Sequence, residues 1–230
     1  MPASPLNVNV WIWSLDVEPA LQARLAAWLS PDERARAARF ATEQLRGRWT
    51  VARAGMRGVL AAEAGLSPEA LQFAYSANGK PLLPDWSEGV WFNLSHSQDL
   101  AALAVCEAPV GVDIERIGAP HEDVAQRFFS PAEAAALLAT PKAERAAAFY
   151  RCWTAKEAFL KALGTGFARA SDSFTINFAS DLSPSLVEIA WLEEAREDWS
   201  FELFAPAPHF MGAIAVRAAN QLIIDAAPAK

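Results

Sequence analysis

The order of helices and strands repeats along this chain, and that repeat is the feature that most limits which folds it can adopt. In the first half, Ser30 followed by Pro31 is a typical helix start, and Gly65 is a typical helix end. In the second half, Ser130 with Glu133 is typical of a capping box, and a longer helix is predicted over 146–164. Strand-like segments follow the helices in both halves, so the sequence predicts an α+β fold.

The predicted strands are divided between the two halves. They are recognised by alternating apolar residues or by β-branched and aromatic composition. They lie at 7–15, 73–76, 91–94, 100–105, 110–114, 174–178, 187–191, 201–204, 211–216 and 222–224. We therefore expect two α+β lobes of similar size, an N-terminal lobe over 1–108 and a C-terminal lobe over 109–230.

The composition is that of an ordinary globular protein, because 53% of the 230 residues are hydrophobic and 20% are charged. It excludes a disordered chain, collagen and a coiled coil. Neither Cys106 nor Cys152 belongs to a C-x-x-C pair, so neither a disulfide framework nor a zinc site is indicated. No apolar run approaches the roughly 18 residues of a membrane span, and no secretion signal is recognisable. We expect a cytoplasmic protein that does not bind membranes.

The net charge of −7 argues against a protein dedicated to binding nucleic acid. The charge is uneven, because seven arginines and only three acidic residues lie between Ser30 and Leu60. This segment indicates either a local site for an anionic ligand or a solvated helix face.

Two carboxylates lie two positions apart in one predicted strand. The side chains of Asp113 and Glu115 should share one face about 6.6–6.8 Å apart, with Val112 and Ile114 on the buried face. Mg²⁺ prefers one or two carboxylates together with phosphate oxygens and water. The pair predicts either a magnesium site or only a solvated strand end.

Three further segments carry polar or charged groups. Glu157 and Lys161 share a helix face, an arrangement that by itself indicates only a surface ion pair. His96, in Asn-Leu-Ser-His-Ser, either binds an anion or is a turn residue. A serine hydrolase is not indicated, because Gly-x-Ser-x-Gly is absent. Lys80, in the turn Asn-Gly-Lys-Pro, either contacts a phosphate or only completes the turn.

The order of these segments closely resembles the 4'-phosphopantetheinyl transferases of the long, surfactin-synthetase-activating type. The shared motifs are Gly-Lys-Pro, Asn-x-Ser-His-Ser, Gly-Val-Asp-Ile-Glu and Trp-Thr-x-Lys-Glu-Ala-x-x-Lys, the last running from Trp153 to Lys161. The resemblance implies a pseudo-dimer of two α+β lobes with coenzyme A in the cleft between them. It also implies transfer of the phosphopantetheine arm to a serine of an acyl or peptidyl carrier protein, with release of adenosine 3',5'-bisphosphate. We expect a monomer.

The resemblance also implies roles for individual residues. Asp113, Glu115 and Glu157 would ligate Mg²⁺, with Mn²⁺ as the alternative. Glu157 would be the general base, directly or through a metal-bound water. Lys161 would stabilise or protonate the leaving phosphate, and Lys156 would give electrostatic support. The expected contacts to coenzyme A are Ser95, His96, Lys156 and Lys161 near the phosphates, Lys80 and Pro81 against the nucleotide, and Arg36, Arg48 and Arg53 as candidates for the 3'-phosphate.

One departure and three other readings belong beside this interpretation. Some relatives carry a lysine near the position of Glu33, and the acid here places that contact on Arg36 or Arg48 instead. The arginine-rich segment could also dock the acidic helix of a carrier protein. The carboxylates are compatible with a metal-dependent phosphohydrolase or nuclease. A non-catalytic coenzyme A-binding module would keep the arginines but lose a carboxylate or Lys161, and all of these residues are present.

Overall fold

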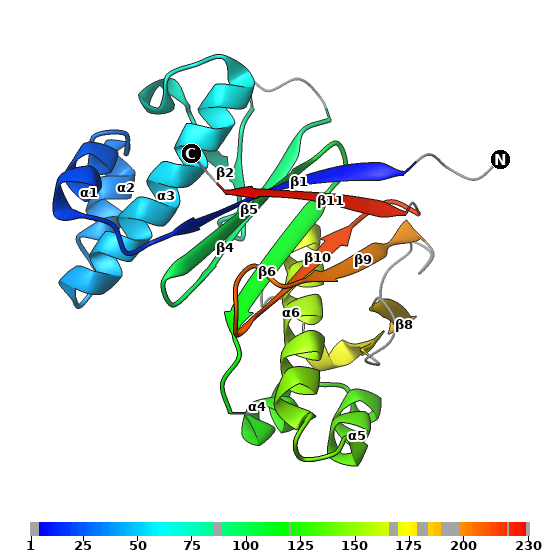
Figure 1. Cartoon of the computed structure of the whole chain (residues 1–230). Helices are drawn as coiled ribbons and strands as arrows, with labels where there is room; N and C mark the ends of the chain where they lie inside the picture. The colour runs from blue at the N-terminus through cyan, green and yellow to red at the C-terminus, as the bar shows by residue number, and fades with distance from the viewer. Residues whose placement is uncertain are drawn as a thin grey trace.

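Two β-sheets lie side by side at the centre of the computed structural model, with one group of helices beside each (Figure 1). The structure describes residues 5–84, 89–119, 121–165, 170–178, 184–189, 198–219 and 221–228. Within those residues, no helix is long and apolar enough to cross a lipid bilayer. The predicted mixture of helices and strands is confirmed.

The first half of the chain forms one long helix, two short ones and a set of strands. Its elements are β1 (Leu6–Ser14), α1 (Pro19–Ala26), α2 (Pro31–Ala37), α3 (Glu43–Ala64), the 3₁₀ turn Pro68–Ala70, β2 (Ala74–Tyr75), β3 (Pro81–Leu82), β4 (Trp91–Ser97) and β5 (Leu100–Cys106).

The second half repeats this pattern around a second long helix. Its elements are β6 (Val110–Arg116), α4 (Glu122–Phe128), α5 (Pro131–Ala139), α6 (Arg145–Leu163), the 3₁₀ turn Ser171–Ser173, β7 (Phe174–Asn177), β8 (Ser185–Ile189), β9 (Ser200–Phe204), β10 (Phe210–Val216) and β11 (Leu222–Pro228). The strand predicted at 187–191 is described only as far as Ile189. Helix α4 was not predicted, because its N-cap, His121, makes no capping bond that the sequence could signal.

The strands form two main sheets, of order β11-β1-β5-β4 and β6-β10-β9. Strand β11 comes from the C-terminal half but pairs in parallel with β1, with Leu222 opposite Leu6. This last strand follows the boundary predicted between 108 and 109 but returns to the N-terminal sheet, and the boundary itself stays a prediction. Strands β4 and β6 are edge strands of their sheets and pack against each other, so the two sheets meet there.

The helix ends follow the signals in the sequence. Ser30 and Ser130 each accept a hydrogen bond from the backbone N–H of Glu33 and Glu133, and each glutamate accepts one from its serine's N–H. Helices α3 and α6 end at Gly65 and Gly164, which have φ of 67° and 70°. These positive values are the left-handed conformation that glycine adopts at low cost.

Helix α6 packs against β6 and β10. Gly111 of β6 makes this approach possible, because a Cβ there would lie 2.0 Å from the carbonyl oxygen of Ala158 and 2.4 Å from the nitrogen of Ala162. Asp113 and Glu115 follow Gly111 at alternate positions and so face the same helix. On the opposite face, Val112 and Ile114 are fully buried in the core, as predicted.

Candidate active site

An open cavity of about 300 Å³ lies where β4, β6 and α6 meet. Its lining consists of Leu94, Ser95 and His96 from β4, Asp113 and Glu115 from β6, and Trp153, Glu157 and Lys161 from α6. The strand pair and the helix pair singled out in the sequence thus border one space, although more than forty positions separate them along the chain. The cavity also draws residues from both halves of the chain.

Asp113 is the most enclosed of the three carboxylates, at 4% exposure. Its Oδ1 accepts a hydrogen bond of 2.9 Å from the Ser95 hydroxyl and lies 2.6 Å from the ammonium of Lys161. Its Oδ2 is buried and has no hydrogen-bond partner among the described residues. A buried carboxylate oxygen without a donor is costly, so this atom is suited to accept a ligand or a cation.

The two glutamates carry raised pKa values. Burial raises the pKa of Glu157 to about 7, and repulsion from Asp113 adds to the effect. Burial also raises the pKa of Glu115, against a hydrogen bond from the Ser97 hydroxyl that lowers it. Both shifts arise chiefly from burial, and repulsion from the Asp113 carboxylate adds to each of them.

Lys161 is the cation nearest these carboxylates. Its ammonium donates to Asp113 Oδ1, to the Ser95 hydroxyl at 2.9 Å and to the carbonyl oxygen of Val112 at 3.2 Å. Glu157 and Lys161 share a helix face because they are four residues apart. Trp153 is four residues before Glu157, so the same spacing brings its ring to the cavity.

The donor set fits a divalent cation in its chemistry. All three side chains offer hard carboxylate oxygens, Asp113 Oδ2 is unpartnered, and both glutamates are destabilised as anions. In the part of the chain that is described, no three acidic, histidine or cysteine side chains surround one point closely enough to hold a metal ion. The three-carboxylate ligand set therefore stays a prediction.

Two more cavities continue from this one toward the N-terminal helices. The middle cavity, of about 170 Å³, shares Leu94 and His96 with the first. It is also lined by Arg36, Trp49, Ala52, Arg53, Tyr75, Gly79, Pro81 and Asn93. The outer cavity, of about 740 Å³, shares five of those residues and adds Asp32, Glu33, Ala35, Arg39 and Phe40. Together they make a groove with carboxylates at one end and arginines with aromatic rings at the other.

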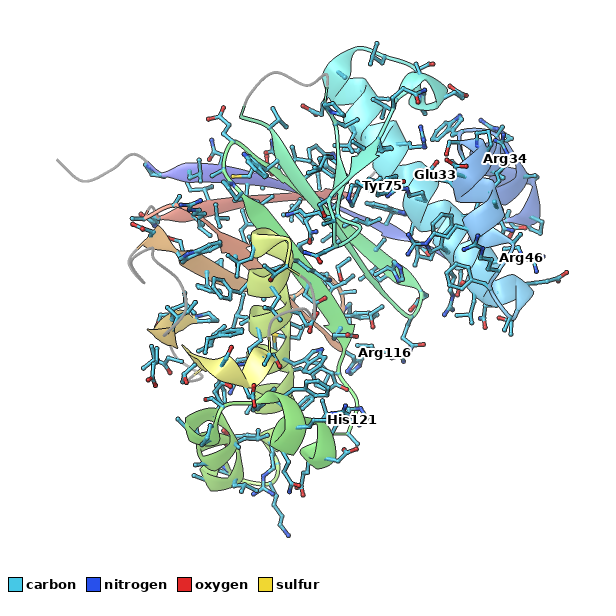
Figure 2. The ribbon with its side chains drawn as sticks, turned by 180° about the vertical axis from the view of Figure 1, so that it is seen from behind. Glu33, Arg34, Arg46, Tyr75, Arg116 and His121 are labelled. Carbon is cyan, nitrogen blue, oxygen red and sulfur yellow. The ribbon has the colours of Figure 1, made fainter. Side chains whose placement is uncertain are left out.

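The arginine end contains free and committed guanidinium groups. Arg36 and Arg39 are exposed, and the guanidinium of Arg36 lies 5.8 Å from the ring centroid of Trp49. Arg53 is buried and donates to Glu33 at 2.5 Å and to the Tyr75 hydroxyl at 2.6 Å. Figure 2 shows Glu33 and Tyr75 close together beside α3. Arg53 thus borders the groove with its charge only partly balanced, because Glu33 also pairs with Arg57.

The carboxylate of Glu33 is engaged by arginines of the protein itself and is not available to a ligand. The residue is 3% exposed, and its second oxygen accepts a hydrogen bond of 2.7 Å from Arg57. Burial raises the pKa of Glu33, but the hydrogen bonds from Arg57, Ser30 and Arg53 outweigh it and lower the pKa below its ordinary value. The acid at this position therefore anchors Arg53 and Arg57 of α3.

Two predicted contacts, Arg48 and Lys80, lie away from the groove and have their charged groups engaged elsewhere. Arg48 lines none of the three cavities and makes a two-point ion pair with Asp16, at 2.6 and 2.7 Å. The ammonium of Lys80 donates to the carbonyl oxygens of Lys161 and Val110, at 2.7 and 3.2 Å. Burial lowers the pKa of Lys80 to about 8. This lysine ties its turn to the end of α6.

Lys156 is the clearest correction. It is 2% exposed, and its ammonium donates to both carboxylate oxygens of Glu133 and to the carbonyl oxygen of Phe174. Neighbouring residues on a helix point about 100° apart, so Lys156 turns into the core where Glu157 faces the cavity. The structure does not bring the predicted electrostatic support of Lys156 to the site.

Several residues in or beside the groove were not predicted as site residues. Ser97 holds Glu115 and continues the alternation of Ser95 along β4, which was a signal available in the sequence. Trp153 could have been found from its helical spacing to Glu157. Arg39, Trp49 and Tyr75 reach the outer cavity from separate elements, and no local pattern marks them.

Comparison with known proteins gives consistent matches over both halves. Residues 17–108 match a family model described as 4'-phosphopantetheinyl transferase, N-terminal, and residues 109–217 match one described as the 4'-phosphopantetheinyl transferase superfamily. The 4'-phosphopantetheinyl transferase HetI of Nostoc sp. is 39% identical over 215 residues, which are 91% of this chain and 87% of the relative.

Two further similarities were found. The 4'-phosphopantetheinyl transferase Sfp of Bacillus subtilis is 32% identical over 69% of this chain and 70% of its own. The crystal structure of the Thermotoga maritima holo-[acyl-carrier-protein] synthase has a TM-score of 0.39 and 23% identity, covering 48% of this chain and 63% of that one.

Proposed function

Because the chain belongs to the 4'-phosphopantetheinyl transferase superfamily, we propose that it moves the phosphopantetheine arm of coenzyme A to a serine of an acyl or peptidyl carrier protein. Adenosine 3',5'-bisphosphate is the second product. The observation that carries this proposal is that Asp113, Glu157 and Lys161 border one cavity, which continues into a groove lined by arginines and aromatic rings.

The groove has the character that coenzyme A requires. An adenine needs flat apolar partners, which Trp49 and Tyr75 offer, and a 3'-phosphate needs a cation, which Arg36 and Arg39 offer in exposed form. Arg53 lines both the middle and the outer cavity and adds a positive charge there. The pyrophosphate then belongs at the opposite end, beside Lys161.

Asp113, Glu115 and Glu157 are the residues that would hold a divalent metal, Mg²⁺ or Mn²⁺. When bound, such an ion neutralises the negative charge that develops on the pyrophosphate oxygens. The unpartnered Oδ2 of Asp113 and the raised pKa of Glu157 support this assignment. To bind the cation, Glu157 must be ionised. The ion pair between Lys161 and Asp113 must also loosen, because the cation takes the place of the ammonium beside this carboxylate.

Glu157 is the proposed general base. Its carboxylate takes the proton of the carrier serine while the serine oxygen forms a bond to the β-phosphorus, and the bond from that phosphorus to the bridging oxygen breaks. A general base in this position contributes typically about 10²–10⁴-fold in rate. The ammonium of Lys161 stabilises the charge on the leaving phosphate.

We also propose that the two halves of the chain are a pseudo-dimer with the site between them. Each half begins a helix with a capping box, at Ser30 and at Ser130. In each, the capping glutamate makes a buried ion pair with the half's long helix, Glu33 with Arg53 and Glu133 with Lys156. Since one chain supplies both halves, a monomer suffices.

The experiment that tests the function combines the chain with coenzyme A, Mg²⁺ and an apo carrier protein, and the carrier is then weighed by mass spectrometry. The transferase adds the phosphopantetheine mass to the carrier, and Asp113→Ala abolishes that addition. A phosphohydrolase would instead consume coenzyme A without a carrier product. A coenzyme A-binding module would leave both molecules unchanged, and either outcome contradicts the proposal.

A further inference from the structure

Side chains on one face of β4 bond to the backbone of β6 in a regular ladder. Asn93 Oδ1 accepts from the N–H of Val112 at 2.9 Å, and the Ser95 hydroxyl accepts from the N–H of Ile114 at 3.3 Å. The Ser97 hydroxyl continues the ladder by accepting from the N–H of Arg116, also at 3.3 Å. Figure 2 places Arg116 at the end of β6 that leads on to His121. The two sheets are thus joined by side chains from alternate positions of one strand.

The two serines of this ladder make a second bond, to the carboxylates. The Ser95 hydroxyl donates to Asp113 Oδ1 at 2.9 Å, and the Ser97 hydroxyl donates to Glu115 Oε2 at 2.6 Å. A serine hydroxyl has one proton to donate and accepts with its lone pairs. The strand N–H groups therefore occupy the accepting side of each hydroxyl and direct its proton onto the carboxylate.

Ser97 is separated from the phosphate-binding chemistry that involves Ser95. The Ser95 hydroxyl is shared with the ammonium of Lys161 and borders the inner cavity, whereas Ser97 is absent from the cavity lining. Ser97 contacts Glu115 and the backbone of β6, behind the carboxylate. Ser97 is therefore placed to orient a metal-binding side chain, Glu115, from outside the cavity.

We propose that Ser97 is a positioning residue, which fixes Glu115 by holding Oε2 and so leaves Oε1 as the oxygen available to a divalent cation. This inference rests on the proposed function, because it concerns the metal ligands assigned there. Partners that orient a metal-binding side chain typically contribute about 10–100-fold in metal affinity or activity. Without the hydroxyl, Glu115 would lose the bond that fixes Oε2 and keep only its interaction with the Trp153 side chain, while the lobes would remain joined by Asn93 and Ser95.

The test uses the full chain saturated with coenzyme A and measures Mg²⁺ affinity by titration calorimetry. Ser97→Ala is expected to weaken Mg²⁺ binding about 10–100-fold, and Ser97→Thr, which keeps a hydroxyl, is expected to retain most of the affinity. Ser97→Val has the shape of threonine without the hydroxyl and is expected to behave like alanine. If Ser97→Ala does not fold, the threonine and valine pair decides the question.

A matched control removes a hydroxyl of the same kind elsewhere. Ser171 is buried outside the groove and donates one hydrogen bond of 2.8 Å, to the carbonyl oxygen of Phe128. Ser171→Ala is expected to lower the melting temperature but to leave the Mg²⁺ affinity unchanged. Equal Mg²⁺ affinity in wild type, Ser97→Ala and Ser97→Val would overturn the positioning role and leave the proposed function standing.

A second measurement, made without metal or coenzyme A, tests the hydrogen bond of Ser97 separately from the proposed metal site. Hydrogen exchange of the Arg116 amide is expected to accelerate in Ser97→Ala and to stay slow in Ser97→Thr, because only the latter keeps the acceptor. Unchanged exchange in both would contradict the ladder itself. Failure of the wild type to bind Mg²⁺ while the amide responds as expected would overturn the metal site and, with it, the role assigned to Ser97.

Discussion

Gly111 lies so close to Ala158 that a Cβ on the glycine would stand 2.0 Å from the alanine's carbonyl oxygen. The same Cβ would stand 2.4 Å from the backbone nitrogen of Ala162. Both atoms belong to the backbone of α6, so the helix must move to make room. That contact fixes the distance between the strand that carries Asp113 and the helix that carries Glu157.

We expect Gly111→Ala to destabilise the protein and to lower turnover together, because the added methyl group pushes α6 away from β6. Overpacking of this kind typically costs about 1–3 kcal/mol, and the backbone contact places this variant at the upper end. Thermal unfolding and the carrier-loading rate measure the two effects.

Gly65→Ala is the control, since no atom lies within 4 Å of its added Cβ and the site is remote. Its positive φ makes it destabilising without a loss of turnover. Full turnover in Gly111→Ala would show that the separation of β6 and α6 is not critical.

Glu157→Gln keeps the shape of the side chain but removes its ability to accept a proton as a carboxylate. Turnover is expected to fall about 10²–10⁴-fold, the usual contribution of a general base, with the fold intact. The measurement is the rate of holo-carrier formation, with circular dichroism to verify folding. Wild-type turnover in this variant would refute the assignment of Glu157 as the base.

The same variant makes a prediction about stability and pH. The folded pKa of Glu157, about 7, exceeds its ordinary value of 4.5, so the folded state binds more protons than the unfolded state between those values. The stability linked to this proton is fully present below pH 4.5 and is lost as the pH rises through 7. Glutamine cannot ionise, so the melting temperature of Glu157→Gln relative to wild type should rise between pH 5 and pH 8 in metal-free buffer. A difference that does not change with pH would mean that the pKa of Glu157 is ordinary.

Lys156 offers a contrasting prediction, because it lies next to Glu157 in sequence but faces the core. Lys156→Met leaves Glu133 buried without its cation, and breaking a buried pair in this way typically destabilises a protein by about 3–5 kcal/mol. Turnover per folded molecule should stay close to wild type. The double variant with Glu133→Gln should recover part of the stability. A large loss of turnover at unchanged stability would return Lys156 to the catalytic set.

Much of the fold was predictable because its signals are local. The caps at Ser30 and Ser130 and the glycine ends of α3 and α6 are decided by a few neighbouring residues. The pairing of β11 with β1 joins the two ends of the chain, and no local pattern encodes that partner. Alternation along β6 gave the face shared by Asp113 and Glu115, because the side-chain period of a strand is fixed.

The candidate site was predictable where two residues share an element and less so where charges find distant partners. The sequence does not reveal that Asp16 pairs with Arg48, or that Glu33 holds Arg53. Which arginines stay free for an anion is settled only by the fold. The inward direction of Lys156, by contrast, was available from helical geometry.

The proposed transfer depends on Asp113, Glu115 and Glu157, carried by β6 and α6, holding one divalent cation. The most direct measurement is a Mn²⁺ titration followed by electron paramagnetic resonance, with coenzyme A present, in wild type and in Asp113→Ala. We expect wild type to take up Mn²⁺ and Asp113→Ala, though folded, not to do so. Equal uptake by both proteins would contradict this expectation.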